Sequence, residues 1–408
     1  MNADKPGIPP TSAPADTADI PMQSAIPETP FAIPETPPAI PAQAGIQNEP
    51  ANSCYHSRLL QAGDEEPIRQ LFREVFGHSM SSALWQWKYA RQHSHAALVF
   101  RDGALVAHYG GLGRKVLLRG KETLAVQIAD VMVAPSARRS VRRNSPFFLA
   151  FTTFVDALVG YGRAFPLGFG FPSDRHLKLA RHLGCYAPVG SMTETTWTLT
   201  PESDSSHASS HHPQASPRHS RAGGNPALGS PRTPATNIAT NIATNIAINT
   251  AINTAWAALA GCLREHIVGV RDAIWIKQRY LDHPERTYQL HLVYSRFGGS
   301  RLGRWLRRPP LGLLVLQEEA EGLLLMDVIG AFRHFPTLIG EALALTRQAG
   351  KPRLRTWSST AFAPLFKVHD ASQQRLPITT PTCIWSPGPA PESLDQRWWL
   401  MAGDTDFL

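Results

Sequence analysis

The sequence contains few cysteines and no long apolar run, and both shortages restrict the kind of protein it can be. Its four cysteines are Cys54, Cys185, Cys262 and Cys383. They have neither the short spacings of a metal site nor the density of a disulfide-stapled domain, so we expect a reducing compartment. No apolar stretch approaches the roughly 20 residues that span a bilayer. Because the N-terminus also lacks the basic and apolar regions of a signal peptide, we predict a cytoplasmic protein without a membrane span.

The composition combines a moderate positive charge with enough apolar residues for folded cores. The formal net charge is +8, and 43% of the 408 residues are hydrophobic. This charge is compatible with an acidic substrate, a phosphorylated cofactor or a nucleic acid, and it selects none of them. The length is sufficient for two domains. The 35 prolines are too many for one compact fold, which predicts segments outside the folded cores.

Two segments have compositions that give them little to bury. Residues 1–52 are rich in proline and repeat the unit Ile-Pro-Glu-Thr-Pro at 26–30 and 33–37. Residues 201–254 are first rich in Ser, His and Pro and then repeat the unit Thr-Asn-Ile-Ala. We expect both to be disordered, one as a leader and the other as a linker. No neighbour fixes a ligand geometry for the clustered histidines of the linker, so no metal site is predicted.

Residues 57–200 alternate helical and strand-like patterns. Asp64 precedes an apolar helical stripe, and two hairpins follow, the second of which ends in a strand at 127–133. Ser145 and the proline after it have the chemistry of a helix start, with phenylalanines at helical spacing behind them. A strand, a helix and a last strand at 187–199 complete the segment. This order predicts an α/β fold with a mixed sheet.

The turn between the central strand and the helix at Ser145 is a candidate anion site. Unpaired N–H groups at a helix start attract phosphate, and guanidinium groups add charge-assisted bonds. The same turn could instead be an ordinary solvated basic turn, and the residues alone leave both possibilities open. Nucleic-acid binding is not favoured, because no aromatic residues are interleaved with the basic ones. The turn contains Arg138, Arg139, Arg142, Arg143 and Asn144.

Residues 256–408 repeat the pattern of the first segment at a lower level of similarity. Trp275–Tyr280 resembles Trp85–Tyr89, and Asp327 follows an apolar strand as Asp130 does. The arginine cluster of the first segment is absent from the second. A repeat unit of this length predicts two tandem copies of one domain, the second degenerate.

These motifs resemble the GCN5-related N-acetyltransferase (GNAT) superfamily. Gln61–Ile68 is similar to the first strand and helix of that family, Asp130–Arg138 to its central strand and acetyl-CoA loop, and His182–Tyr186 to its closing helix and strand. The resemblance covers 57–200 well and 256–408 weakly. It implies a GNAT-like mixed central sheet flanked by helices in each copy. It also implies that an acyl group is transferred from acetyl-CoA to an amine acceptor.

The resemblance also implies where acetyl-CoA binds. In the family, the cofactor lies along the central strand, here Val131, Met132 and Val133, and the amides of the next turn hold its pyrophosphate. That turn contains glycines in the family, whereas here Arg138–Asn144 has none. Glycine lets a backbone approach phosphate closely, but arginine can pair with phosphate through two N–H groups. We therefore expect the arginine-rich turn and Ser145 to bind the cofactor.

The transfer needs a base for the ammonium and a group that protonates the thiolate. The family's usual acid is a tyrosine at a position that is Ala180 here, and His182 and Tyr186 are the nearby candidates. Asp130 is the candidate base, unless its carboxylate pairs with an arginine of the neighbouring turn. His108 is a weaker alternative base.

Three other functions remain open at this stage. A related tandem fold uses aminoacyl-tRNA as donor, a protein can keep the fold and lose the chemistry, and the arginine turn could bind nucleic acid. His176, Lys178 and Arg181 could contact the cofactor or lie on an ordinary solvated helix face, and the solvated face is favoured. The C-terminal tail, Arg397–Leu408, is expected either to close the second core as a strand or to touch the first segment. Nothing in the sequence identifies the amine or an oligomeric state.

Overall fold

The computed structural model describes residues 55–90, 93–138, 142–199, 234–295 and 309–405. Within the helix that begins at Pro234, it describes side chains from residue 245 onward. The described residues all belong to one compact unit. The leader predicted at residues 1–52 lies outside them. No helix in the described part of the chain is long and apolar enough to cross a membrane.

The N-terminal half of this unit, residues 55–199, begins with a strand and two helices. Its elements in chain order are β1 (Tyr55–Leu59), α1 (Glu65–Phe76), α2 (Ser82–Tyr89), β2 (Ser94–Arg101), β3 (Ala104–Leu118), β4 (Lys121–Val133), η1 (Pro135–Ala137), α3 (Pro146–Leu158), β5 (Leu167–Gly170), α4 (Asp174–His182) and β6 (Tyr186–Thr198).

The C-terminal half, residues 234–405, begins with a long helix. Its elements in chain order are α5 (Pro234–Cys262), β7 (Ile267–Gly269), α6 (Ala273–Ile276), η2 (Lys277–Leu281), β8 (Gln289–Val293), β9 (Gly312–Glu319), β10 (Gly322–Gly330), η3 (Phe332–His334), α8 (Phe335–Gln348), β11 (Arg353–Ser359), η4 (Thr360–Phe366), β12 (Ser372–Cys383), α9 (Pro391–Leu394), β13 (Trp398–Trp399) and η5 (Ala402–Asp404).

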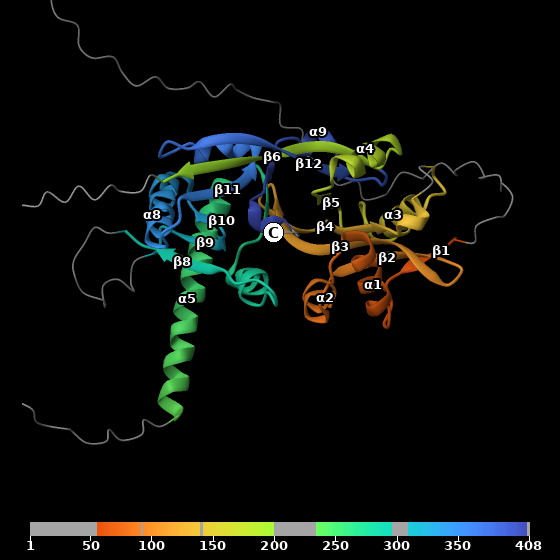
Figure 1. The fold of residues 1–408 in the computed structure, drawn as a ribbon. Coiled ribbons are helices and arrows are strands. Elements are labelled where there is room, and N and C mark those ends of the chain that lie inside the picture. The colour runs from red at the N-terminus through yellow and green to blue at the C-terminus, as the bar shows by residue number, and fades with distance from the viewer. Residues whose placement is uncertain (1–54, 91–92, 139–141, 200–233, 296–308, 406–408) are drawn as a thin grey trace, which may run out of the picture. The chain divides into compact units, whose positions relative to one another are not determined.

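One mixed sheet runs through both halves (Figure 1). Its strand order is β1-β2-β3-β4-β5-β12-β6-β11-β10-β9-β8. Within this order, two neighbouring pairs are parallel, β4 with β5 and β10 with β11; off this order, β7 pairs with β3 and, in parallel, with β13. Each half thus has an antiparallel meander followed by a parallel pair, and the two halves meet at β12 and β6. The predicted mixed α/β sheet flanked by helices is confirmed.

The two strands at the centre of the sheet are exchanged between the halves. β6 belongs to the N-terminal half but pairs with β11, from Met192 opposite Ser359 to Thr198 opposite Arg353. β12 belongs to the C-terminal half but lies beside β5, where Thr382 is opposite Phe169. The sequence predicts that the strand at 187–199 completes the first segment. It lies instead between β12 and β11, because β12 takes the place next to β5.

Helix α5 corrects part of the expected linker. Residues 201–233 lie outside the described residues, but the chain is helical from Pro234 to Cys262. Ile252, Ala255 and Leu259 are buried in the C-terminal core, and their spacing places them on one face of a helix. A disordered linker is therefore wrong for residues 234–254. Once one end of a helix is packed, alanine-containing repeats without glycine or proline can extend it.

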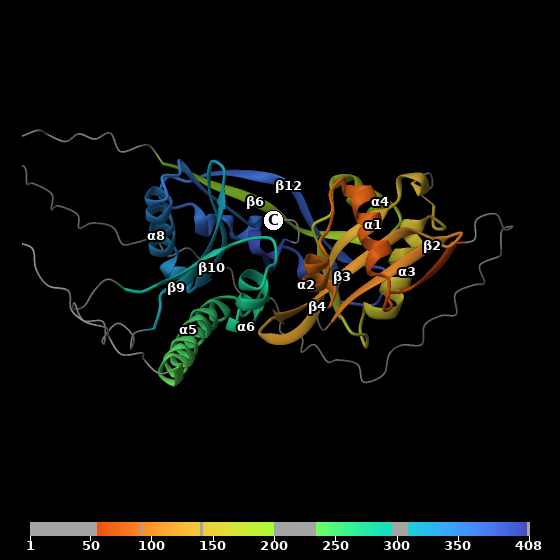
Figure 2. The same cartoon turned by 60° about the horizontal axis from the view of Figure 1, so that its bottom comes forward.

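Helices α2 and α3 cover opposite faces of strand β3 (Figure 2). A Cβ at Gly110 would collide with the hydroxyl of Tyr89, and a Cβ at Gly111 would collide with the ring of Phe154. Adjacent residues of a strand face opposite sides, so both faces need a residue without a side chain here. The predicted start of α3 is confirmed, since the Ser145 side chain accepts a hydrogen bond from the N–H of Phe148, the third residue of the helix.

Candidate functional site

Strands β4 and β5 begin as parallel neighbours and then separate. Their pairing runs from Ala125 opposite Leu167 to Ile128 opposite Gly170, where it ends. β4 continues to Val133, whereas β5 stops and the chain turns into α4. A cavity of about 880 Å³ lies where the strands diverge. The edge of β4 beyond Ile128 therefore has no partner strand on this side and can offer backbone groups to a ligand.

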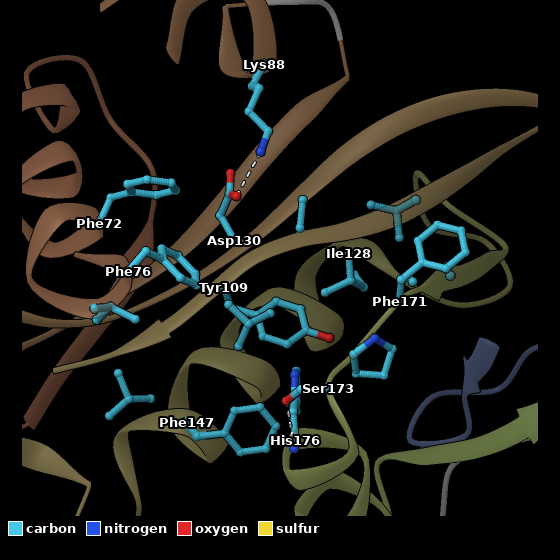
Figure 3. Close-up of a pocket in the computed structure, with 18 of the residues that line it drawn as sticks. Phe72, Phe76, Lys88, Tyr109, Ile128, Asp130, Phe147, Phe171, Ser173 and His176 are labelled. Atoms are coloured by element: carbon cyan, nitrogen blue, oxygen red, sulfur yellow. Dashed lines mark hydrogen bonds and ion pairs between the residues drawn. The ribbon is translucent and has the colours of Figure 1, made fainter. Parts of the chain in front are cut away.

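Both halves of the chain form the wall of this cavity, and Figure 3 shows lining residues of the N-terminal half. The N-terminal half contributes α1, α2, the end of β4, the start of α3, and α4. The C-terminal half contributes η2, the segment after it and the end of β12. The residues from the C-terminal half are Arg279, His283, Glu285, Arg286, Pro381 and Cys383.

Asp130 lies at a bulge of β4 and lines the cavity. The register between β3 and β4 shifts between His108 and Gly110, and Asp130 has a φ of 48°, which costs a non-glycine residue about 1 kcal/mol. Its carboxylate accepts a hydrogen bond from Lys88 Nζ at 2.8 Å (Figure 3) and another from Tyr89 Oη at 2.7 Å. Its backbone carbonyl accepts a hydrogen bond from His108 Nδ1 at 2.7 Å. The bulge is thus held from several sides.

These contacts make Asp130 a paired carboxylate. Burial would raise the pKa of Asp130, but the Lys88 ammonium and the Tyr89 hydroxyl outweigh burial and lower it below the usual range. The sequence left open a pairing with an arginine of the next turn, and the cation is Lys88 instead. Burial lowers the pKa of His108, which is therefore a neutral ring behind the bulge.

Tyr186 and His182 both line the cavity. Tyr186 opens β6, and its hydroxyl is hydrogen-bonded to the hydroxyl of Tyr109. Burial raises the pKa of both hydroxyls, so both stay protonated at neutral pH and one can donate a hydrogen bond into the cavity. His182 is the last residue of α4, and its side chain is exposed.

His176 is a cavity residue that the sequence assigns to the surface. The predicted solvated helix face holds for Lys178 and Arg181, which are exposed, and is wrong for His176. The His176 ring lies between Phe147, at 5.1 Å between centroids, and Tyr186, at 5.8 Å. Its Nε2 atom is buried without a hydrogen-bond partner. Burial lowers the pKa of His176 to about 4, so the ring is neutral at pH 7.

The start of α3 and one arginine form the end of the cavity suited to an anion. Ser145 lines it and accepts a hydrogen bond from the Phe148 N–H at 3.3 Å. Arg138 also lines it, and its Nε donates to the Val133 carbonyl at 2.8 Å, which fixes the guanidinium at the end of β4. A helix N-terminus with a guanidinium beside it favours phosphate groups.

The other residues of the arginine turn that the structure describes do not line the cavity. Arg143 lies over the Trp385 ring at 5.9 Å, and the Arg142 carbonyl accepts from the Ser145 N–H at 2.9 Å. Asn144 is exposed. Arg139 lies outside the described residues. The structure thus brings one member of the predicted cluster to the cavity.

The three strand residues that the resemblance assigns to the cofactor divide between the two faces of β4. Val131 and Val133 line the cavity. Met132 is buried in the core on the other face. This alternation follows from the period of two in a strand, so only the backbone of Met132 is available to a ligand.

In the C-terminal half, the chain's own tail occupies the corresponding place. β10 and β11 pair from Leu323 to Leu325 and then separate. The Ser359 N–H donates to the Leu400 carbonyl at 2.9 Å, and the Leu400 N–H donates to Ser359 Oγ at the same distance. Trp399 is fully buried in the C-terminal core. The gap between these strands is therefore filled by protein.

Asp327 in β10 has partners of the same kind as Asp130. The register with β9 shifts at Asp327, as the register of β4 shifts at Asp130. The carboxylate accepts from Arg271 Nε at 2.9 Å and from Tyr280 Oη at 3.2 Å. Each half thus has an aspartate at a strand bulge, paired with one cation and one tyrosine, and Asp327 is the fully buried one.

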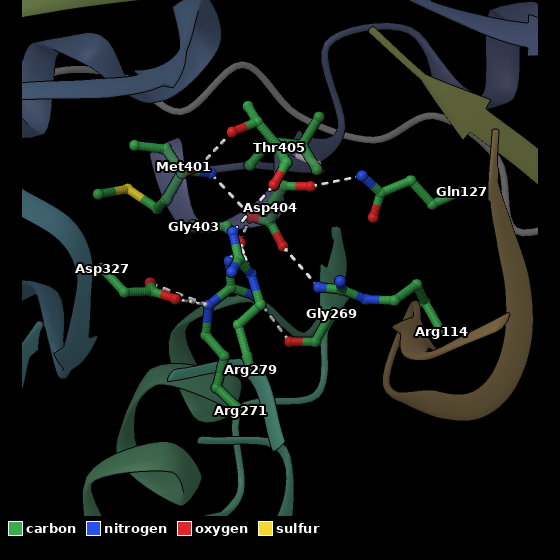
Figure 4. Close-up of polar contacts among 12 residues, drawn as sticks. Arg114, Gln127, Gly269, Arg271, Arg279, Asp327, Met401, Gly403, Asp404 and Thr405 are labelled. Atoms are coloured by element: carbon green, nitrogen blue, oxygen red, sulfur yellow. Dashed lines mark hydrogen bonds and ion pairs between the residues drawn. The ribbon is translucent and has the colours of Figure 1, made fainter. Parts of the chain in front are cut away.

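The tail joins the two halves through Asp404 (Figure 4). Its carboxylate accepts from Arg271 and, at 3.2 Å, from Arg114 Nη2 of β3. The Gln127 side chain of β4 donates to the Asp404 carbonyl at 2.7 Å. The predicted contact between the tail and the first segment is confirmed. None of the described tail residues lines the cavity.

Comparisons with known proteins agree with this architecture. Residues 56–144 match the family model of an acetyltransferase (GNAT) domain. A probable N-acyltransferase of unknown function from Enterococcus faecalis V583 has a similar structure, with a TM-score of 0.51 and 12% identity over 81% of this chain and 72% of that chain. No curated protein matches the sequence.

Two GCN5-related N-acetyltransferases are also similar. The enzyme from Kribbella flavida has 12% identity and a TM-score of 0.46 over 80% of this chain and 71% of its own. The enzyme from Anabaena variabilis ATCC 29413 has 15% identity and a TM-score of 0.47 over 80% and 72%.

The matched segment runs from β1 into the turn before α3 and so contains the whole of β4. The family model does not extend into the C-terminal half, and a second copy of the domain stays a prediction. The E. faecalis structure shows that the fold is shared with a known protein. Residues 56–144 therefore match the acetyltransferase (GNAT) domain model, as the motifs of that segment predict.

Proposed function

We propose that the protein is an acyl-CoA-dependent N-acyltransferase that moves an acyl group, acetyl in the simplest case, to an amine. One observation carries the proposal. The strands of the GNAT domain separate at a cavity that has a helix N-terminus and Arg138 on its wall. A thioester with a phosphorylated carrier needs such a combination of an apolar slot and an anion site.

The residues present fit acetyl-CoA. The start of α3 and Arg138 would hold its phosphates. The edge of β4 from Ala129 to Val133 would hydrogen-bond its amide-bearing arm, with apolar contact from Ile128 and Phe171. Bound in this way, the thioester supplies an activated acyl group for attack by an amine.

The chemistry at the cavity would be divided among few groups. The Tyr186 hydroxyl, oriented by Tyr109, would donate a hydrogen bond to sulfur as negative charge develops there. His182, exposed at the cavity wall, would accept the proton of the amine. Asp130 keeps its pair with Lys88 and would act as a positioning residue for the β4 edge.

The separated strands of the C-terminal half would bind no thioester of their own. They enclose the tail, and this half lacks the arginine turn. The described cysteines, Cys185, Cys262 and Cys383, are unpaired thiols, which supports the reducing, cytoplasmic compartment that we propose.

Calorimetry with acetyl-CoA, longer acyl-CoAs and free CoA tests this function, and CoA release in the presence of amines tests catalysis. We expect micromolar binding of acetyl-CoA to the wild type. Tyr186→Phe should lower kcat by roughly 100-fold with acetyl-CoA affinity unchanged, in the range of lost general acid catalysis. Absence of CoA binding would reject the proposal, and binding of a charged tRNA in its place would favour an aminoacyl-tRNA donor.

A further inference from the structure

One end of the cavity has an aromatic wall. Phe72 and Phe76 of α1 contact each other, with ring centroids 4.7 Å apart, and Leu84 and Trp87 of α2 extend the surface. Phe76 is 45% exposed although its side chain is large and apolar. Figure 3 shows Phe72 and Phe76 together on one side of Asp130, away from His176. Apolar area left open on a cavity wall indicates an apolar ligand.

The C-terminal half fixes this wall in place. His283 packs on the Trp87 ring with centroids 4.5 Å apart, and Trp87 Nε1 donates to the Gln278 carbonyl at 2.8 Å. The Ser81 hydroxyl donates to the Glu285 carboxylate. These contacts hold α2 and close the aromatic end of the cavity with residues that the GNAT family match does not cover.

The charges on the cavity wall do not suit a polycation. Among the described lining residues the acidic ones are Asp130 and Glu285. Asp130 is paired with Lys88, and Glu285 accepts a hydrogen bond from Ser81. The basic residues on the wall outnumber them, and like charges repel. They are Lys88, Arg138, Arg175, Arg279 and Arg286.

We propose that the acceptor is a primary monoamine whose body is apolar or aromatic. This inference rests on the proposed function and adds the chemical class of the second substrate. The body of the acceptor packs on Phe72, Phe76 and Trp87, and its single amine points along the cavity toward Tyr186. A polyamine would place further ammonium groups against the arginines, and a lysine peptide would bring a polar backbone to the aromatic wall.

Calorimetry on the full chain saturated with CoA measures this preference without any need for turnover. The probes are phenethylamine, hexylamine, spermidine and a neutral peptide with one lysine. We expect both monoamines to bind at least tenfold more tightly than spermidine and the peptide, and CoA release from acetyl-CoA to follow the same order. Tighter binding of spermidine or of the peptide overturns the proposal, as does the absence of monoamine binding.

Two variants test whether the aromatic wall binds the amine. Phe76→Ala should weaken phenethylamine binding about tenfold, within the range for lost contacts in an apolar pocket, and leave CoA affinity unchanged. Tyr161→Ala is the matched control, because Tyr161 is an exposed aromatic residue, 54% accessible, outside the cavity wall. Equal phenethylamine affinity in Phe76→Ala and the wild type overturns the assignment. If phenethylamine binds and CoA does not, the acyltransferase function fails and the amine site stands.

Discussion

Replacement of Asp404 by alanine should destabilise the protein more than most single substitutions. Asp404 is 1% exposed, and its carboxylate accepts from Arg271, from Arg114 and from the Met401 N–H at 2.8 Å. Burial opposes the charge of Arg271, yet Asp327 and Asp404 together raise the pKa of that guanidinium. Without Asp404, the fully buried Arg271 loses one of its two carboxylates. Removing one partner of a buried ion pair costs about 3–5 kcal/mol.

Urea unfolding followed by circular dichroism measures this cost. Glu321→Ala is the control, because Glu321 pairs with Arg353 at the surface with 71% of its side chain exposed. Surface pairs contribute about 0–1 kcal/mol, so the control should unfold close to the wild type. Asp404→Asn keeps the shape and should fall between the two. A loss below about 1 kcal/mol for Asp404→Ala would show that Arg271 is stable with Asp327 alone, and the reasoning would be refuted.

Three further results are expected. Arg138→Ala should weaken CoA binding about tenfold at low salt and reduce its salt dependence in calorimetry, because one phosphate contact is lost; equal affinity would remove Arg138 from the site. Burial lowers the pKa of His176 from 6.5 to about 4, so the unfolded chain binds a proton at this residue before the folded chain does. The free energy of unfolding should therefore be highest above pH 6.5 and fall by about 3 kcal/mol toward pH 4. His176→Leu should lack this share of the pH dependence in urea titrations. Deletion of residues 1–51 should leave the urea midpoint unchanged, since a proline-rich segment has no core to join; a lower midpoint would show that it packs.

Local patterns in the sequence predict the elements around the cavity well. The strand that ends before Pro135 and the helix that starts at Ser145 both form, because capping and periodicity act over a few neighbouring residues. The neighbour of a strand in the sheet cannot be predicted in the same way. The alternating pattern of β6 allows it to pair with β5 or with β11, and β12 occupies the position next to β5.

The partner of Asp130 and the location of His176 could not be predicted from the sequence, because both depend on contacts between distant segments. Asp130 pairs with Lys88 because a bulge turns its side chain, and no glycine marks that positive φ in the sequence. His176 lies three residues after Ser173 on a helix with charged neighbours, so its pattern is that of a surface face. The rings that enclose His176 belong to Phe147 and Tyr186. Both lie outside the helix of His176, so no local pattern marks this histidine as a cavity residue.

The exchange of β6 and β12 has a consequence during synthesis of the chain. Domains that emerge first from the ribosome usually fold first. Here β5 gains its neighbour β12, and the cavity wall gains Pro381 and Cys383, only after the ribosome has passed residue 383. The nascent N-terminal half therefore has an unpaired sheet edge, which can associate with other chains. The cavity wall is therefore complete only after β12 has been synthesised, long after strands β4 and β5.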